Sequence, residues 1–290
     1  MSFKGTLYLA GLSVLLSFSS ASGAGNVQAT ENVPEIRLYT MDCGRIDFKD
    51  LGPIFSDTGE LDGKPGRLSD PCFLIRHPKG TLIWDTGLGD KLAEDKNGID
   101  NPNFGLHLSV AIKLADQLKS LGMTPADITY VAFSHFHSDH TGNAGLFTRS
   151  TWIVNKSELA YAAQVPVPIS VDPDIAAETR GVKQQLIDTD YDVFGDGTVC
   201  ILKTPGHTPG HQSLEIKLKN SGTVLLSGDL YHQRDSRKLR LVPPLNYERA
   251  DTLASIDRFE RIAKNNNARV VIQHDQQDFQ AMPKFPAYLD

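Results

Sequence analysis

The sequence predicts a layered α/β fold, and three observations lead to this prediction. Short apolar runs typical of strands occur in both halves of the chain, and helical patterns lie between them, as in proteins whose helices cover β-sheets. Of the 290 residues, 40% are hydrophobic and 22% charged, which supports a buried core and excludes disordered, collagen-like and coiled-coil chains. No internal repeat or Pro/Ser-rich linker divides the sequence, so we expect one domain over residues 30–290.

The individual elements follow from hydrophobic patterns bounded by turn residues. In chain order, strands are expected at residues 35–41, 72–76, 81–84, 128–134, 152–155, 200–203, 213–218, 223–227 and 269–273. The turn His77-Pro78-Lys79-Gly80 joins the second and third strands as a hairpin. Apolar residues at helical spacing predict helices at residues 110–121, 156–163 and 251–264.

Residues 87–107 are polar and rich in Gly and Asn, which predicts a long loop. Loops of this length in compact domains are usually functional or mobile, and Phe104 and Leu106 are apolar residues that could cover a site. A solvated excursion is the alternative.

The first 24 residues have the plan of a secretory signal peptide. Lys4 precedes an apolar run at residues 5–18, and small residues follow at 19–24. The run is shorter than the roughly 20 residues that span a bilayer; an uncleaved membrane anchor is the alternative. Cleavage is expected after Ala24 or Ala29, giving a periplasmic or secreted protein without stable membrane association. Loss of residues 1–24 takes the formal charge from −6 to −7, so nucleic acid is not an expected partner.

Export implies an oxidising compartment, but the three cysteines allow at most one bridge within the chain. Cys43 and Cys72 lie at the edges of expected strands and could pair. Cys200 lies in an apolar strand, where we expect a buried thiol. Disulfides are therefore not expected to be the main source of stability.

A dense set of metal-ligand residue types follows the strand expected at 128–134. The segment His135-Phe136-His137-Ser138-Asp139-His140 holds four potential ligands within six residues. His135 and His137 are two residues apart, so in an extended chain they point the same way and can grip one ion, while Asp139 and His140 can turn toward another. A lone histidine is usually structural, but this spacing indicates a metal site.

Three later residues are expected at strand ends, which converge on one edge of a layered α/β protein. They are His207 in a Gly/Pro-constrained loop, Asp229 after the strand at 223–227, and His274 after the strand at 269–273. His211 in the loop of His207 is expected to fix that loop by hydrogen bonds. His77 and His107 have no motif context and are expected to be structural or on the surface.

These motifs resemble the metallo-β-lactamase superfamily, whose signature is H-x-H-x-D-H followed by a later His, Asp and His. The resemblance covers nearly the whole chain after the signal segment, including the Asp85-Thr86-Gly87 turn. It implies an αββα sandwich with a two-metal site at one edge of the sheets, holding two Zn²⁺ or other divalent ions per chain. It also implies the ligands: His135, His137 and His207 for the first metal, Asp139, His140 and His274 for the second, and Asp229 as the bridge. Asp85 would orient a ligating imidazole, or it is only a turn carboxylate.

Within the superfamily, the chain looks most like the N-acyl homoserine lactonases. The resemblance lies in the ligand order, the opening Leu38-Tyr39-Thr40-Met41-Asp42-Cys43-Gly44 and the short ending after His274. It implies hydrolysis of a small-molecule acyl lactone by a hydroxide held between two metals, with Asp139 and Asp229 as catalytic residues. Those enzymes carry a catalytic Tyr shortly after the bridging Asp. Here Tyr231 is the candidate, with His232 or a merely packed Tyr231 as alternatives.

The same motifs are compatible with other functions. True metallo-β-lactamases usually carry Cys or Ser where Asp229 stands, and the 16 residues after His274 leave no room for an added thioester-binding domain. A β-lactamase, thioesterase or other ester hydrolase remains an alternative of the same fold. A periplasmic metal-binding protein with a structural site is the non-enzyme alternative. Structural zinc is normally closed by four ligands, often Cys, so the seven-ligand set favours an enzyme.

Overall fold

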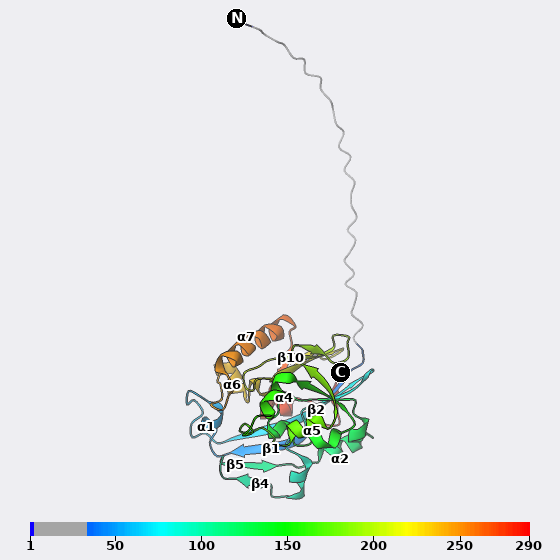
Figure 1. Ribbon diagram of the computed structural model, residues 1–290, viewed down its shortest axis with the longest axis vertical. Helices are drawn as coiled ribbons and strands as arrows, with labels where there is room; N and C mark the ends of the chain where they lie inside the picture. The colour runs from blue at the N-terminus through cyan, green and yellow to red at the C-terminus, as the bar shows by residue number, and fades with distance from the viewer. Residues whose placement is uncertain (3–33) are drawn as a thin grey trace. The chain divides into compact units, whose positions relative to one another are not determined.

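Two β-sheets lie face to face, and helices cover their outer faces (Figure 1). The computed structural model describes residues 1–2 and 34–290. Apart from its first two residues, the expected signal peptide lies outside the described residues, as do both expected cleavage positions. Among the described residues, no helix has the length and apolar character needed to cross a membrane.

The larger sheet of the described chain runs in the order β4-β5-β1-β2-β3-β6-β7-β8, and β14 also pairs with β1. Its strands are β1 (Arg37–Phe48), β2 (Gly66–His77), β3 (Gly80–Trp84), β4 (Ile99–Asn101), β5 (Leu106–Ser109), β6 (Tyr130–Ala132), β7 (Thr151–Asn155), β8 (Lys183–Ile187) and β14 (Tyr288–Leu289). The smaller sheet runs in the order β13-β12-β11-β10-β9. Its strands are β9 (Tyr191–Asp192), β10 (Val199–Lys203), β11 (Gln212–Leu218), β12 (Gly222–Leu226) and β13 (Arg269–Val271).

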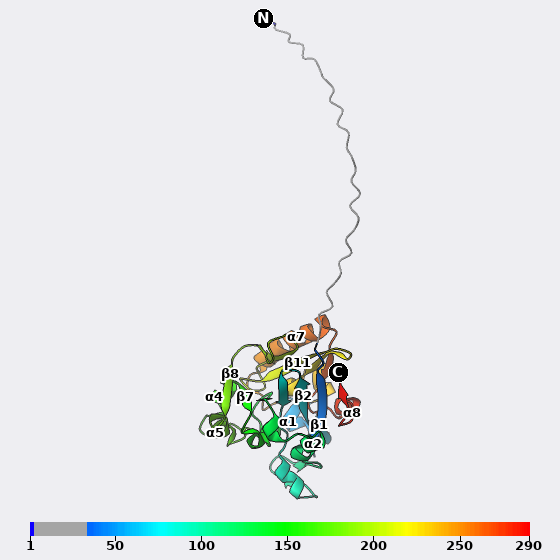
Figure 2. The ribbon, with the colours of Figure 1, turned by 90° about the vertical axis from the view of Figure 1, so that its right-hand side faces the viewer.

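The helices lie on both outer faces of this sandwich, and α7 is on the opposite side from α2 and α5 (Figures 1 and 2). The described helices are α1 (Gly52–Phe55), α2 (Leu114–Ser120), α3 (Ser138–Thr141), α4 (Lys156–Ala162), α5 (Ile175–Arg180), α6 (Arg234–Leu239), α7 (Arg249–Asn265) and α8 (Gln276–Ala281). Short 3₁₀ turns are η1 (Asp90–Glu94), η2 (Pro125–Asp127), η3 (Ala144–Phe147) and η4 (Gly228–Leu230).

Alternation of side chains along the strands creates the layers. Leu38 of β1 faces the smaller sheet and packs in one cluster with Leu214 of β11. Met41, three residues further along β1, points to the outer face and packs with Leu114 of α2. On the far side of the smaller sheet, Phe259 of α7 covers the strands. Successive residues of a strand point to opposite faces of the sheet. A strand whose odd-numbered and even-numbered positions are both apolar therefore buries both faces of the sheet. The predicted αββα sandwich is confirmed.

The predicted long loop at residues 87–107 is partly wrong, because it contains η1 and β4 and runs into β5. Leu106 and Leu108 of β5 pair with Phe48 and Ile46 of β1 and extend the larger sheet by a hairpin. These residues belong to one apolar cluster at that sheet edge. The polar composition of the segment hid its short strands, since β5 is stabilised by pairing with β1, and β4 by pairing with β5, and not by their own hydrophobicity.

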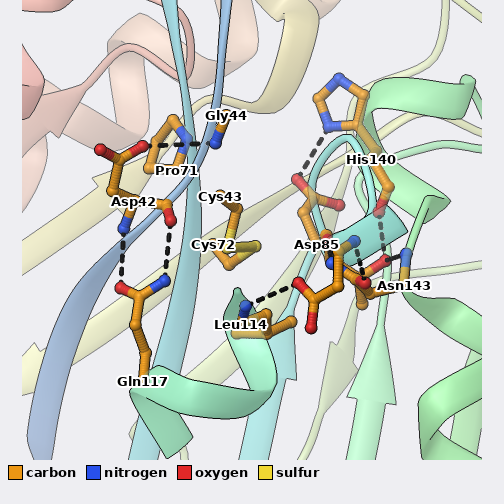
Figure 3. Close-up of a disulfide and its surroundings, with 12 residues drawn as sticks. Asp42, Cys43, Gly44, Pro71, Cys72, Asp85, Leu114, Gln117, His140 and Asn143 are labelled. Carbon is orange, nitrogen blue, oxygen red and sulfur yellow. Dashed lines mark hydrogen bonds and ion pairs between the residues drawn. A yellow bond between two sulfur atoms is a disulfide. The ribbon is translucent and has the colours of Figure 1, made fainter. Parts of the chain in front are cut away.

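A disulfide joins Cys43 of β1 to Cys72 of β2, so the pairing that the sequence left open is present (Figure 3). It lies against the Asp85-Thr86-Gly87 turn: a Cβ at Gly87 would be 2.3 Å from the Cβ of Cys43, and Gly87 has φ of 69°. Glycine is therefore required for this close approach. Cys200 lies on β10 as expected but is only half-buried.

Replacing both bridged cysteines by alanine should lower the free energy of unfolding by about 3–4 kcal/mol, because the bridge closes a loop with a sequence separation of 29 residues. Urea unfolding of metal-free protein measures the difference. Cys200→Ala is the control and should cost less than about 1 kcal/mol, since it removes only a half-buried thiol. Equal unfolding midpoints for the double variant and the wild type would contradict this role of the bridge.

Candidate metal centre

The predicted ligand residues all follow strands at one edge of the sandwich. His135 and His137 come after β6, and Asp139 and His140 lie on α3, which follows them directly. His207 follows β10 in the smaller sheet. Asp229, in η4 after β12, and His274, after β13, complete the set, and they also follow strands of the smaller sheet. The predicted convergence of strand ends is therefore observed.

These side chains form two groups among the described residues. The three-histidine group consists of His135, His137 and His207, and the mixed group consists of Asp139, His140 and His274. Within each group, and between the three-histidine group and Asp229, the potential ligand atoms lie within 4.8 Å of one another.

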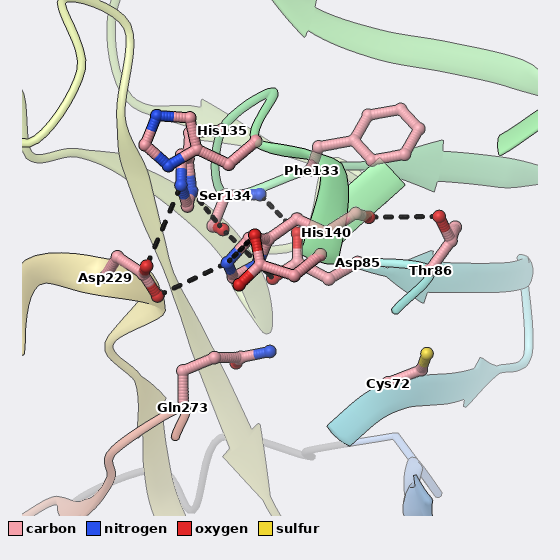
Figure 4. Close-up of polar contacts among 12 residues, drawn as sticks. Cys72, Asp85, Thr86, Phe133, Ser134, His135, His140, Asp229 and Gln273 are labelled. Carbon is pink, nitrogen blue, oxygen red and sulfur yellow. Dashed lines mark hydrogen bonds and ion pairs between the residues drawn. The ribbon is translucent and has the colours of Figure 1, made fainter. Parts of the chain in front are cut away.

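Asp229 lies between the two groups and presents one carboxylate oxygen to each (Figure 4). Its Oδ2 is 3.8 Å from Nε2 of His135 and 3.6 Å from Nε2 of His207. Its Oδ1 is 3.4 Å from Nε2 of His140 and 3.0 Å from Nε2 of His274. Asp229 is therefore placed where both groups can share one carboxylate.

Three of the ligand imidazoles, those of His135, His140 and His274, are held by Nδ1, which leaves Nε2 facing the site. Nδ1 of His135 is 3.1 Å from the Ser134 hydroxyl, and Nδ1 of His274 donates to the Ser69 carbonyl at 2.8 Å. Within the described structure, Nε2 of His135 and of His140 are buried and have no hydrogen-bond partner. An unpaired buried nitrogen is costly, and a divalent ion satisfies it as a ligand does. The donor set therefore fits a divalent metal site.

Burial and charge divide the two groups electrostatically. Burial lowers the pKa of His135 and of His207 well below the usual range and that of His137 to about 4, so the three-histidine group is neutral, as metal ligands must be. In the mixed group, burial opposes protonation, but Asp229 raises the pKa of His274 to about 9. Metal binding to this group therefore releases protons.

Comparison with known proteins agrees with this geometry. Residues 65–274 match the family model of the metallo-beta-lactamase superfamily. The chain belongs to this superfamily.

The relatives of this superfamily member include several lactonases. It is 34% identical over 270 residues to the N-acyl homoserine lactonase AttM of Rhizobium radiobacter, a match over 88% of this chain and 98% of the relative. It is 30% identical over 261 residues to the N-acyl homoserine lactonase AiiA of Bacillus thuringiensis subsp. kurstaki, over 87% and 98% of the two chains. A solved N-acyl homoserine lactone hydrolase with the product N-hexanoyl-L-homoserine at its catalytic metal centre has a TM-score of 0.76 and 27% identity, covering 88% of this chain and 99% of that one.

Two polar residues of this superfamily member, Asp85 and His211, contact ligand residues from outside the site. Asp85 is fully buried; its Oδ2 lies 3.1 Å from Nδ1 of His140 and its Oδ1 accepts from the Ser134 amide at 2.6 Å. His211 donates from Nδ1 to the Thr204 carbonyl at 2.8 Å and accepts at Nε2 from the Asp229 amide at 2.9 Å. Asp85 thus orients an imidazole, and His211 fixes the backbone of the bridging Asp229.

The two histidines without a motif lie away from the ligand groups. His77 is buried and stacks on Phe194 with ring centroids 4.2 Å apart. His107 is partly exposed and pairs with Asp100 at 2.8 Å.

The structure does not place Tyr231, which the sequence predicted to be catalytic, at the cavity. Its ring is fully buried against Phe259 of α7, and its hydroxyl donates to Oε1 of Glu260 at 2.7 Å. Tyr231 has extended backbone angles, so its side chain and that of His232 point to opposite sides. His232 is the residue that faces the metal centre, with Nε2 3.1 Å from Oδ2 of Asp229.

A cavity of about 220 Å³ opens above the metal-ligand residues and has mostly apolar walls. Its floor is formed by His137, Asp139, His207, Asp229, His232 and His274. Its apolar walls include Ile46, Phe48, Phe55, Leu68, Leu88, Phe104, Leu106, Leu108 and Leu245. The sequence anticipated Phe104 and Leu106 but missed the residues from β1, which alternate as Ile46 and Phe48 at the end of a strand that is longer than predicted.

Proposed function

We propose that this superfamily member is a metal-dependent hydrolase that opens the lactone ring of N-acyl homoserine lactones. The observation that carries the proposal is a bridging carboxylate, Asp229, with an imidazole group on each side, at the floor of an apolar cavity. The lactonases to which the chain is similar support the same substrate class. The ligand set is larger than the four ligands that close a structural zinc site, which speaks against a purely structural metal.

Ring opening adds water across one C–O bond: the oxygen goes to the carbonyl carbon, and a proton must reach the ring oxygen that leaves. Bound divalent ions supply Lewis acidity and lower the pKa of water, so that no protein nucleophile is needed. The residues of the chain hold and orient the reactants. Asp139 is the ligand carboxylate most open to the cavity, with 24% of its side chain exposed, and we assign it the transfer of the proton to the leaving oxygen.

His232 is the residue best placed to contact the carbonyl oxygen of the substrate. It lines the cavity and lies beside Asp229, while the neighbouring Tyr231 is engaged by Glu260. A hydrogen-bond donor aimed at an oxygen that gains negative charge lowers the barrier of acyl transfer. We assign this role to His232.

We further propose that the native ions are two Zn²⁺ per chain. Imidazole and carboxylate ligands suit zinc, and neither group is complete unless Asp229 is shared.

Export to the periplasm or medium is also proposed, supported by the signal-peptide plan and by a disulfide typical of oxidising compartments. The mass of the mature protein distinguishes cleavage after Ala24, cleavage after Ala29 and an uncleaved chain.

Purified wild-type protein should contain two metal ions per chain, as measured by elemental analysis after zinc addition and gel filtration. Asp229→Ala should lose at least one ion and lower kcat by orders of magnitude, because it removes the carboxylate shared by both groups. His211→Ala should be much milder, since His211 holds the Asp229 backbone and the Thr204 carbonyl and does not belong to either ligand group. A wild-type stoichiometry of one that zinc does not raise would exclude the two-ion site, and metal loss in His211→Ala but not in His207→Ala would reverse the ligand assignment in that loop.

His232→Phe should lower kcat about 100-fold with the metal content unchanged, because it removes one donor to the developing oxyanion. Steady-state kinetics and metal analysis on the same preparation measure both quantities. Tyr231→Phe is the matched control and should keep near wild-type kcat, since its hydroxyl faces Glu260. A large loss in Tyr231→Phe with none in His232→Phe would exchange the two roles.

Longer acyl chains should be better substrates, because each CH₂ buried in the apolar cavity contributes about 0.8 kcal/mol and two extra carbons raise kcat/KM roughly tenfold. Hydrolysis of a lactone series, with β-lactams and thioesters in parallel, measures this preference. Phe104→Ala should reduce the dependence on chain length, since Phe104 forms part of the cavity wall. Equal activity on all chain lengths would remove the cavity from the proposal, and turnover of β-lactams or thioesters without lactone turnover would replace the substrate class.

A further inference from the structure

Glu158, in the first turn of α4, is a buried carboxylate that belongs to neither ligand group. Only 2% of its surface is exposed. It accepts three hydrogen bonds: its Oε1 accepts from the Phe136 amide at 2.9 Å, and its Oε2 accepts from the Thr208 hydroxyl at 2.6 Å and from the Gly210 amide at 3.0 Å. All three donors lie in the two loops that carry the three-histidine group.

These loops come from different sheets. Phe136 stands between His135 and His137 in the loop after β6 of the larger sheet, and Thr208 directly follows His207 in the loop after β10 of the smaller sheet. At the point where they meet, Nε2 of His207 is 3.2 Å from Nδ1 of His137. One carboxylate therefore ties together the two segments whose separation sets the size of this ligand group.

Two neighbouring residues, Asn155 and Gly210, allow Glu158 to contact both loops. The Asn155 side chain caps α4 by accepting from the Ser157 amide at 2.8 Å, which fixes the start of the helix. A Cβ at Gly210 would lie 2.4 Å from the Glu158 amide nitrogen and 2.6 Å from the Glu158 Cβ, so only glycine lets the loop come this close.

An apolar side chain of similar volume would fill the same space without the cost of burying a carboxylate. Burial raises the pKa of Glu158 to about 7 although three donors favour its charged form. The three hydrogen-bond donors in the two loops explain why a carboxylate stands at this position.

We propose that Glu158 is a positioning residue that fixes the His207 loop against the His135–His137 loop and thereby sets the metal affinity of the three-histidine group. The inference rests on the proposed metal centre and deepens it. Glu158 acts only through the backbone and side chain of residues adjacent to the ligands, and it is not among the residues that line the cavity.

The test is a chelator titration that follows the release of Zn²⁺ from the intact protein in two steps. In Glu158→Gln, an amide N–H₂ replaces one accepting oxygen, so at least one loop loses its partner. We expect one of the two ions to bind about tenfold more weakly and the other to be unchanged. The weakened step should be the one abolished by His207→Ala, which removes a ligand of the same group.

Glu215→Gln is the matched control, since Glu215 is another buried glutamate, on β11, and accepts from Asn266 at 2.6 Å. It should release both ions as the wild type does. A second pair of variants tests the same contact if Glu158→Gln does not fold: Thr208→Val removes one donor at nearly constant volume and should weaken the same ion, whereas Thr208→Ser keeps the hydroxyl and should retain it.

Selective weakening of the ion that His207 binds supports the proposal. Unchanged release of both ions overturns it, as does equal weakening of both together with a lower Tm of the metal-free protein, which would mean a purely structural role. A wild-type chain that binds no metal would overturn the metal centre itself, and this result is distinct from a wild type with two ions whose affinities Glu158→Gln leaves unchanged.

Discussion

The metal centre depends on the position of one carboxylate, Asp229, which divides its two oxygens between two sets of imidazoles. Those imidazoles come from both sheets, so the site exists only where the sheets pack face to face. The apolar layer between the sheets is thus what brings Asp229 opposite His135 and His140. Any shift of one sheet over the other would alter the distances from both carboxylate oxygens at once.

Around Asp229, contacts from neutral and charged residues fix the orientation of several ligand side chains. Asp85, Ser69 and Ser134 each engage the nitrogen of an imidazole that is turned away from the centre, and His211 holds the Asp229 backbone. These contacts keep the rings of His135, His140 and His274 oriented when no ion is bound. Such contacts prepare the ligands in advance, so less entropy is lost when an ion binds.

The sequence was informative where function rests on local spacing. The His135-to-His140 segment could be identified because its geometry follows from a strand and a single helical turn, and the strand-end positions of His207, Asp229 and His274 followed from apolar runs. The role of Tyr231 could not be settled in this way. Beyond β12 the chain enters a 3₁₀ turn, and which of two adjacent residues faces the cavity depends on the exact backbone angles of that turn. The β4–β5 hairpin was missed for a related reason, since its pairing with β1 is tertiary and leaves little trace in its polar sequence.

Because of the β4–β5 hairpin, natural selection can act on the cavity wall and on the metal-ligand residues independently. The hairpin contributes Phe104, Leu106 and Leu108 to the cavity wall, yet among the described strands it pairs outside itself only with β1, at the sheet edge, and none of the candidate ligands lies on it. Exchanges in its sequence can therefore change the width and length of the cavity while the strands that carry the ligands keep their register. Substitutions in this one surface hairpin can therefore give the protein a new preference among substrates. The protein need not pass through variants that have lost the metal centre.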